Sequence, residues 1–253
     1  MDSHPKAPLS ELIFGMTLKK PIFGIQGFIF ELIHEFKSDY PLIQYGNPLE
    51  DLNLQNYILE PQINYNNTGP LLYRLSTHDS KWLVQLQFNK IFFSWIRKDE
   101  EEVGNFPGYN AVCGKFSQLV SFAQNKLHGE FPVKFCELTY QDRIIWQEHI
   151  DDLSQVDKIL KITLPTIKTA KSTHAPNNLF SKYTIPVDTI GGYAIISINT
   201  ATTKDDRQLL NFQCTLRGSV ENMLIDDWYS NANSIQSKLF TDLFNEELLT
   251  SWK

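Results

Sequence analysis

The segment from Trp82 to Arg143 constrains the fold most, because strand-like and helix-like runs follow each other closely within it. It begins with WLVQLQFNKIFFSWIRK, where apolar and polar residues alternate as along a half-buried strand. Asn89-Lys90 can close a tight hairpin inside this run. After FPGY comes a helix-like stretch, and FCELTYQDRI forms another strand. We therefore expect a sheet with an amphipathic helix packed on it.

The rest of the chain repeats this mixture of elements. A strand is expected at 10–20, a helix at 25–36, and an irregular or edge strand within 40–61. Further strands are expected at 183–187, 192–199 and 209–217, whereas 168–178 should be a polar loop. A last amphipathic helix ends near Trp252 and should dock on strand 209–217 through Ile235, Leu239, Phe240, Leu243, Phe244 and Leu248.

These elements predict an α+β fold with mostly antiparallel curved sheets and long amphipathic helices packed on one face. Residues 1–150 would form an N-terminal α+β half, and 151–253 a C-terminal α+β half packed against it. One continuous domain is the alternative, since 253 residues fit either arrangement. The order of elements also suggests a pseudo-duplication of two β-β-β-α halves.

Composition excludes some classes of protein. The chain has 23 basic and 29 acidic residues and a formal charge of −6, which argues against a role centred on nucleic acid. No apolar run approaches the roughly 20 residues of a membrane-spanning helix. The first residues do not resemble a secretory signal, and Cys113, Cys136 and Cys214 form no CxxC pair. We expect a cytoplasmic protein.

Two clusters of ionisable residues could in principle bind a metal. Glu31, His34 and Glu35 resemble half of a di-metal helix motif, but no second Glu-x-x-His is found, so a solvated helix face is favoured. A second cluster is interpreted as a loop between the halves, and it consists of Glu148, His149, Asp151 and Asp152.

Other single residues have ordinary interpretations. His78-Asp79 is expected in a hairpin turn, and His174 in a polar loop. No GxSxG, HExxH, GxxxxGK[ST] or GxGxxG motif occurs. We therefore nominate no catalytic, cofactor-binding or metal-ligating residue, and we predict no cofactor.

Aromatic and basic residues raise the question of nucleic-acid binding. The aromatic residues could stack on bases, but core packing is favoured because helices are available to cover the sheet. They are Trp82, Phe92, Phe93, Trp95 and Tyr140. At most a small basic patch is expected from Arg97, Lys98, Arg143 and Lys161.

Several segments resemble a sporadically distributed family of uncharacterised bacterial proteins. They are PLSELIFGM at 8–16, LVQLQ with Trp95 and Lys98, FPGY, ELTY, and the helix at 239–252. Gln141 replaces the asparagine that follows ELTY in that family, and the second half of the chain matches loosely. The resemblance implies no assigned activity and no catalytic residue. It implies an accessory or mobile-element gene, for example one of phage defence.

The leading hypothesis is a non-catalytic protein-interaction component whose sheet edges or final helix present the interface, with a homodimer as one option. One alternative is a small-molecule-binding or enzymatic domain with a cavity between sheet and helix. Another is a nucleic-acid-binding module. A filled core with exposed apolar residues would favour the first, a polar cavity the second, and a strongly positive concave surface the third.

Overall fold

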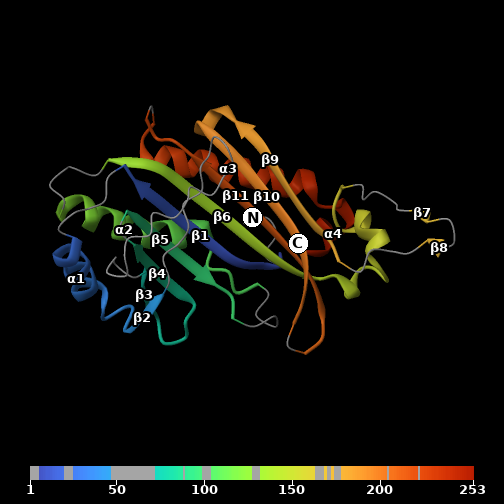
Figure 1. Ribbon diagram of the computed structural model, residues 1–253, viewed down its shortest axis with the longest axis horizontal. Helices are drawn as coiled ribbons and strands as arrows, with labels where there is room; N and C mark the ends of the chain where they lie inside the picture. The colour runs from blue at the N-terminus through green and yellow to red at the C-terminus, as the bar shows by residue number, and fades with distance from the viewer. Residues whose placement is uncertain are drawn as a thin grey trace.

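The computed structural model describes residues 6–19, 25–46, 72–87, 89–98, 104–126, 132–162, 168–169, 172–173, 178–203, 205–221 and 223–253. Its main feature is one open sheet of nine antiparallel strands in the order β2-β3-β4-β5-β1-β6-β11-β10-β9 (Figure 1). The α+β class and the antiparallel pairing predicted from the sequence are therefore confirmed. The strands are β1 (Leu9–Leu18), β2 (Leu42–Gly46), β3 (Leu72–Ser76), β4 (Trp82–Gln87), β5 (Lys90–Ile96), β6 (Val133–Ile145), β9 (Phe180–Val187), β10 (Gly192–Thr202) and β11 (Gln208–Gly218).

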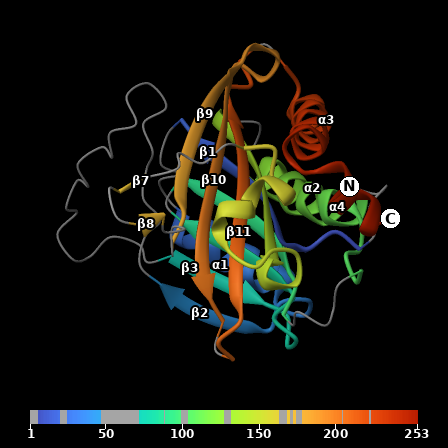
Figure 2. The same ribbon diagram turned by 90° about the vertical axis from the view of Figure 1, so that its right-hand side faces the viewer.

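Helices occupy one side of this sheet in Figure 2, where α2, α3 and α4 lie together. A separate short hairpin pairs β7 (Lys168–Thr169) with β8 (Ser172–Thr173), in a segment that the sequence predicted to be a polar loop. In the described part of the chain, no helix is long and apolar enough to cross a membrane. The helices are α1 (Ile25–Phe36), α2 (Tyr109–Lys126), α3 (Ile225–Leu243) and α4 (Glu246–Ser251), with 3-10 turns η2 (Trp146–Glu148), η3 (Leu153–Lys158) and η4 (Asp188–Ile190).

The two halves expected at 1–150 and 151–253 share this sheet. β6 pairs with β1 on one side and with β11 on the other, so strands from both halves form one continuous hydrogen-bonded layer. Among the described residues, the two halves therefore do not each form a main sheet of their own. A one-residue slip in either pairing would turn buried side chains outward, so the alternating pattern fixes both registers.

One row of paired positions shows how the sheet builds its core. Side chains of directly paired residues lie on the same face, here the face that the helices cover. The interior members of the row are buried, whereas Ile43 and Ile185 at its ends are 41% and 40% exposed. From edge to edge the row is Ile43, Leu75, Val84, Phe93, Phe14, Leu138, Leu216, Ala194 and Ile185.

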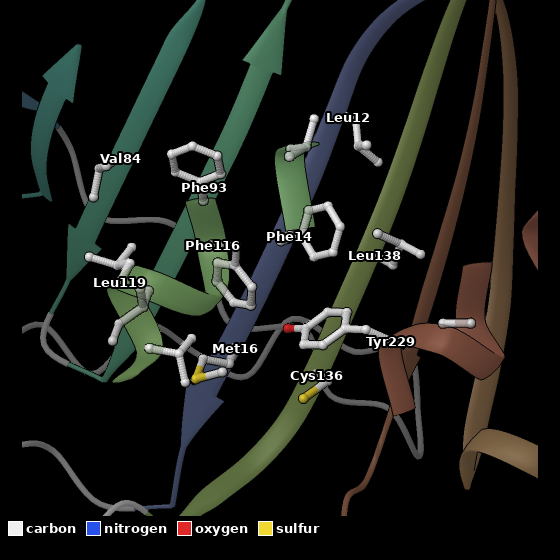
Figure 3. Packing of buried hydrophobic residues seen from close by; sticks show 14 of the residues in the cluster. Leu12, Phe14, Met16, Val84, Phe93, Phe116, Leu119, Cys136, Leu138 and Tyr229 are labelled. Carbon is white, nitrogen blue, oxygen red and sulfur yellow. The ribbon is translucent and has the colours of Figure 1, made fainter. Parts of the chain in front are cut away.

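Phe14 is the centre of this core, as Figure 3 shows. Its ring lies 5.4 Å from that of Tyr109, 5.3 Å from Phe116 and 5.2 Å from Tyr229. Tyr109 and Phe116 belong to α2 and Tyr229 to α3, so one strand residue joins both long helices. The Tyr229 hydroxyl also donates a hydrogen bond to the Gly15 carbonyl at 2.5 Å, which satisfies its polar end inside the core.

The C-terminal segment docks on β11, as the sequence predicted. The rings of Phe212 and Phe244 are 4.9 Å apart, and Trp252 packs 5.9 Å from Phe240. The single helix expected here is in fact two helices, because α3 ends at Leu243 and α4 begins at Glu246. Asn245 caps α4 by accepting a hydrogen bond from the Glu247 N–H at 3.0 Å, which explains the break.

Other predicted elements are also found in the described residues. The strand expected at 10–20 is β1, the helix expected at 25–36 is α1, and the edge strand expected within 40–61 is β2. α1 packs on α2 through the rings of Phe28 and Phe122, 6.4 Å apart. The acidic run at 99–102 and residues 163–167 of the segment KITLPTI lie outside the described residues.

Truncating Trp95 should destabilise the fold strongly. Trp95 is buried on the central part of the sheet, opposite Leu12 and Trp82, as predicted from its strand pattern. Trp95→Ala should lower the free energy of unfolding in urea by about 3–5 kcal/mol. Phe30→Ala is the matched control, because Phe30 is exposed, and its effect should stay within about 0.5 kcal/mol. Similar urea midpoints for the two variants would contradict the assignment of Trp95 to the core.

Removing the end of the chain should prevent folding. A protein that stops at Asn231 would lose Phe240, Phe244 and Trp252 and would leave the apolar face of β11 uncovered. We expect insoluble or unfolded protein, measured by circular dichroism and size-exclusion chromatography, since each such side chain contributes roughly 1.5–3 kcal/mol on burial. Deleting only the exposed Lys253 should have no effect. A shortened chain that is folded and monomeric would show that the segment is an interface element instead.

Candidate functional site

The outer edge of β9 is the main candidate site. β9 is the last strand of the sheet in the described part of the chain and pairs only with β10. The Thr200 N–H donates to the Leu179 carbonyl at 3.0 Å, which makes these residues a directly bonded pair. Bonding direction alternates along an antiparallel strand, so the even-numbered residues of β9 direct their backbone groups away from β10. These outward residues are Phe180, Lys182, Thr184 and Pro186.

Pro186 agrees with this assignment. Proline has no N–H, so within a sheet it is confined to positions that do not bond a neighbouring strand. An outward position on an edge strand meets that condition. The outer edge thus offers N–H groups from Phe180, Lys182 and Thr184, and carbonyls from these three residues and Pro186.

Exposed apolar side chains gather along the two edge strands. Phe180 is 76% exposed and Tyr183 is 44% exposed on β9, and Ile185 follows them on the same strand. On the opposite edge, β2 exposes Ile43 and Tyr45. Single exposed apolar residues are common, but a series along an unpaired strand edge is typical of a surface that contacts another chain.

The sheet face opposite the helices carries polar side chains and a close ion pair. The Arg217 Nε donates to the Glu137 carboxylate at 2.6 Å, and Nη2 contacts the same oxygen. Thr139 and Thr215 share a hydrogen bond of 2.8 Å between their hydroxyls. Burial raises the pKa of Glu11, which also lies on this face. Arg217 therefore contributes no unpaired positive charge to this face.

A second candidate is a buried polar cluster under α3. Asp142 on β6 is fully buried on the helix-covered face, and neither of its carboxylate oxygens has a hydrogen-bond partner in the described part of the chain. Burial raises the pKa of Asp142 to about 7, against the opposing effect of the Arg97 charge. Burial also raises the pKa of Cys214 to about 12, with a further contribution from Asp142, and Gln236 of α3 lies beside Cys214.

Sequence analysis missed Asp142, although a signal was present. Alternation along FCELTYQDRI places Cys136, Leu138 and Tyr140 on one face of the strand, and two residues further it places Asp142 on the same face. Its partner across β6 and β11 is Phe212, a core residue. The cluster is fully enclosed by the core, so we assign it a role in stability and not in ligand binding.

The first predicted cluster lies on a solvated helix face, as expected. Glu31, His34 and Glu35 are all exposed on α1. Glu31 pairs with Lys126 of α2 at 2.9 Å, which is an ordinary surface ion pair.

The second cluster forms the turn after β6. Glu148, His149 and Asp151 are exposed, and Asp152 accepts a hydrogen bond from the Ser154 N–H at 2.8 Å, as an N-cap does. Asp152 is partly exposed, and its hydrogen bonds from Ser154 lower the pKa of its carboxyl group. The described residues contain no group of three or more His, Cys, Asp or Glu side chains placed to hold a metal ion.

The turn at His78 and Asp79 is also found. Asp79 accepts hydrogen bonds from the Thr77 hydroxyl at 2.5 Å and from the Lys81 N–H at 3.0 Å. His174 lies outside the described residues.

The predicted aromatic set is divided between the two faces of the sheet. Phe93, Trp95 and Tyr140 are buried under the helices, so core packing is confirmed for them. Trp82 is half-buried on the same face and pairs with Trp95. Phe92 lies on the opposite face, where its ring covers Gly15, so the five residues do not form one stacking surface.

The basic residues do not form one patch. Arg97 is buried near Asp142, whereas Lys98 is exposed. Arg143 lies on the opposite sheet face from its neighbour Asp142, because successive strand residues point to opposite sides. Lys161 is exposed and lies 3.8 Å from a carboxylate oxygen of α4.

No protein-family model matches this chain, and no curated protein matches it. The resemblance to an uncharacterised bacterial family therefore remains a hypothesis drawn from motifs.

Stability should depend on pH through Asp142. Because the folded-state pKa is about 7 and the model-peptide value is 3.8, the folded state binds a proton between these values that the unfolded state has lost. Stability therefore falls as pH rises from about 4 to about 7, by up to about 4 kcal/mol. Asp142→Asn should remove this loss, so the variant should gain stability relative to wild type as pH rises.

Urea denaturation at pH 5 and pH 8 measures this difference. Asp242→Asn is the matched control, because Asp242 is an exposed aspartate on α3, and its profile should parallel that of wild type. Arg97, whose charge lowers the pKa of Asp142, stays protonated over this range, and the Cys214 thiol, whose pKa is raised to about 12, stays neutral. Parallel profiles for Asp142→Asn and wild type would show that the carboxyl group does not titrate as argued.

Proposed function

We propose that this chain is a non-catalytic protein-binding component and that its partner adds an extended strand to the outer edge of β9. The observation that carries this proposal is an unpaired edge strand with outward backbone groups and the exposed side chains of Phe180, Tyr183 and Ile185. Strand addition takes its affinity from main-chain hydrogen bonds and its specificity from alternate side chains. β9 offers both.

The filled core supports binding over catalysis. Between the sheet and its helices, the ring of Phe14 contacts three other aromatic rings, so side chains occupy the space where a substrate cavity was considered. The three cysteines are poor nucleophiles. Burial raises the pKa of each, to about 12 for Cys136 and Cys214, so the reactive thiolate is scarce at neutral pH.

Nucleic-acid binding is the less favoured alternative. The chain carries a net charge of −6, and Arg217 on the open sheet face is neutralised by Glu137. A protein that depends on phosphate contacts requires a surplus of free cations on one surface.

The proposed cellular context rests on the motif resemblance and on the free cysteines. We place the protein in a bacterial accessory or mobile-element system, such as phage defence, because the resembling family has a patchy distribution. We place it in the cytoplasm because its three cysteines are free, as is usual in a reducing compartment.

We also propose that the sheet arose by duplication, with a repeat boundary between α2 and β6. In each unit a first strand pairs with the last strand of a three-stranded meander, and a long helix follows. One unit consists of β1, the meander β3-β4-β5 and α2. The other unit consists of β6, the meander β9-β10-β11 and α3. This places residues 133–150 with the second unit, whereas the sequence analysis placed the boundary at 150.

Thr184→Pro tests the β9 edge. The substitution removes an outward N–H but leaves the bonds to β10 intact, so the fold should survive while partner binding weakens by about tenfold or more. Ile185→Pro is the contrasting variant, because its N–H faces β10, and it should destabilise the fold.

Affinity capture from the native host, followed by quantitative mass spectrometry, measures partner binding, and thermal unfolding measures the fold. The expected result is a partner retained by wild type and lost by Thr184→Pro. If folded Thr184→Pro retains every specific partner of wild type, the edge is not the binding site.

A further inference from the structure

We infer that the strand added to β9 is the β9 of a second copy of this chain, which joins two nine-stranded sheets across a two-fold axis. This inference rests on the proposed function of the β9 edge. The strand is unpaired on its outer side among the described residues, and a two-fold axis places the same surface on both sides of the contact. The question is whether β9 is complementary to itself.

Outward residues face outward residues whenever the two-fold axis passes beside a residue of β9. Axes beside Lys182, Tyr183 or Thr184 are the central positions, where the two strands overlap most. An axis at Lys182 sets two like charges directly opposite each other, which destabilises a strand pair. An axis at Thr184 places Lys182 against Pro186 of the second copy and leaves only about four main-chain hydrogen bonds within β9.

The axis at Tyr183 avoids the facing lysines and forms more main-chain hydrogen bonds than an axis at Thr184. It pairs Lys182 with Thr184 of the second copy and Phe180 with Pro186, and each pairing occurs twice by symmetry. About six main-chain hydrogen bonds result from the alternation of bonded pairs. Tyr183 then faces its own copy across the axis, and the most exposed apolar side chain, Phe180, packs against a proline ring. β9 is therefore self-complementary in this register.

Charge also favours a second copy over a strongly acidic or basic partner. Lys182 is the only charged residue in β9, and it faces a neutral threonine in this register. An eight-residue strand buries less surface than the roughly 800 Å² per partner of a standard interface. The dimer should accordingly be weak, with a dissociation constant on the order of micromolar.

Self-association should be closed at two copies. The other sheet edge, β2, exposes Ile43 and Tyr45, so a β2-to-β9 contact is the competing arrangement. In such a head-to-tail contact each of the two molecules keeps one unpaired edge. The contact can therefore repeat and produce longer chains of molecules. β2 has five residues and β9 has eight, so pairing β9 with itself satisfies more backbone groups.

Cysteine cross-linking of the full chain tests the register. Facing non-bonded residues lie about 4.5 Å apart between Cα atoms, which is within disulfide range. Tyr183→Cys should therefore form a disulfide-linked dimer under mild oxidation. Lys182→Cys and Thr184→Cys should not, because each would face itself only in the disfavoured registers. Phe30→Cys is the control for random oxidation, because Phe30 is exposed on α1. Wild type should stay unlinked, since Cys136 and Cys214 are buried and Cys113 is half-buried.

Sedimentation of wild type and Thr184→Pro over a wide concentration range tests the dimer itself. Wild type should show a monomer–dimer equilibrium, and Thr184→Pro should remain monomeric. A wild-type monomer at about 100 μM, well above a micromolar dissociation constant, would overturn the inference. Masses beyond a dimer, or efficient cross-linking of Lys182→Cys or Thr184→Cys, would overturn it as well. If wild type is monomeric while Thr184→Pro still loses a different captured protein, the second copy is wrong and the proposed function stands.

Discussion

The pairing of β1 with β6 is the contact on which the rest of the structure depends. It lies at the centre of the sheet and joins the meander β3-β4-β5 to the meander β9-β10-β11. At its middle, Gly15 makes contacts toward both sheet faces, and the contact with Phe92 leaves no room for a larger residue. Its carbonyl accepts a hydrogen bond from the Tyr229 hydroxyl of α3. On the other face, a Cβ at position 15 would lie 2.2 Å from the Phe92 ring. The helices and both sheet faces are thus fixed at one short segment of β1.

Asp142 is the main departure from an apolar core along this joint. It lies on β6 between the end of β1 and β11, and α3 covers it. A buried carboxylate without hydrogen bonds is costly, and the protein reduces this cost by holding a proton and by placing Arg97 nearby. Because the same residues join both meanders, protonation at this point affects the stability of the whole sheet.

Local pattern predicted the elements well and their arrangement poorly. Alternation identified β1 as a strand, and helical spacing identified α1 and the C-terminal stripe. Alternation cannot say which strands become neighbours, and the partners of β1 are distant in sequence. The break between α3 and α4 had a local signal in Asn245 followed by two glutamates, which is a helix start. The β9 edge had only Pro186 as a hint, because an edge is defined by strand order.

An open sheet explains why the candidate site consists of backbone groups rather than a set of reactive side chains. The helices cover one face, and on the other face Glu137 pairs with Arg217. The strand edges remain, because closure into a barrel is the only arrangement that removes them. Proteins usually protect an edge with charge, proline or a short strand. β9 has one lysine and one proline near its end, yet it keeps exposed Phe180, Tyr183 and Ile185 along its length. We therefore propose that another chain pairs with this weakly protected strand.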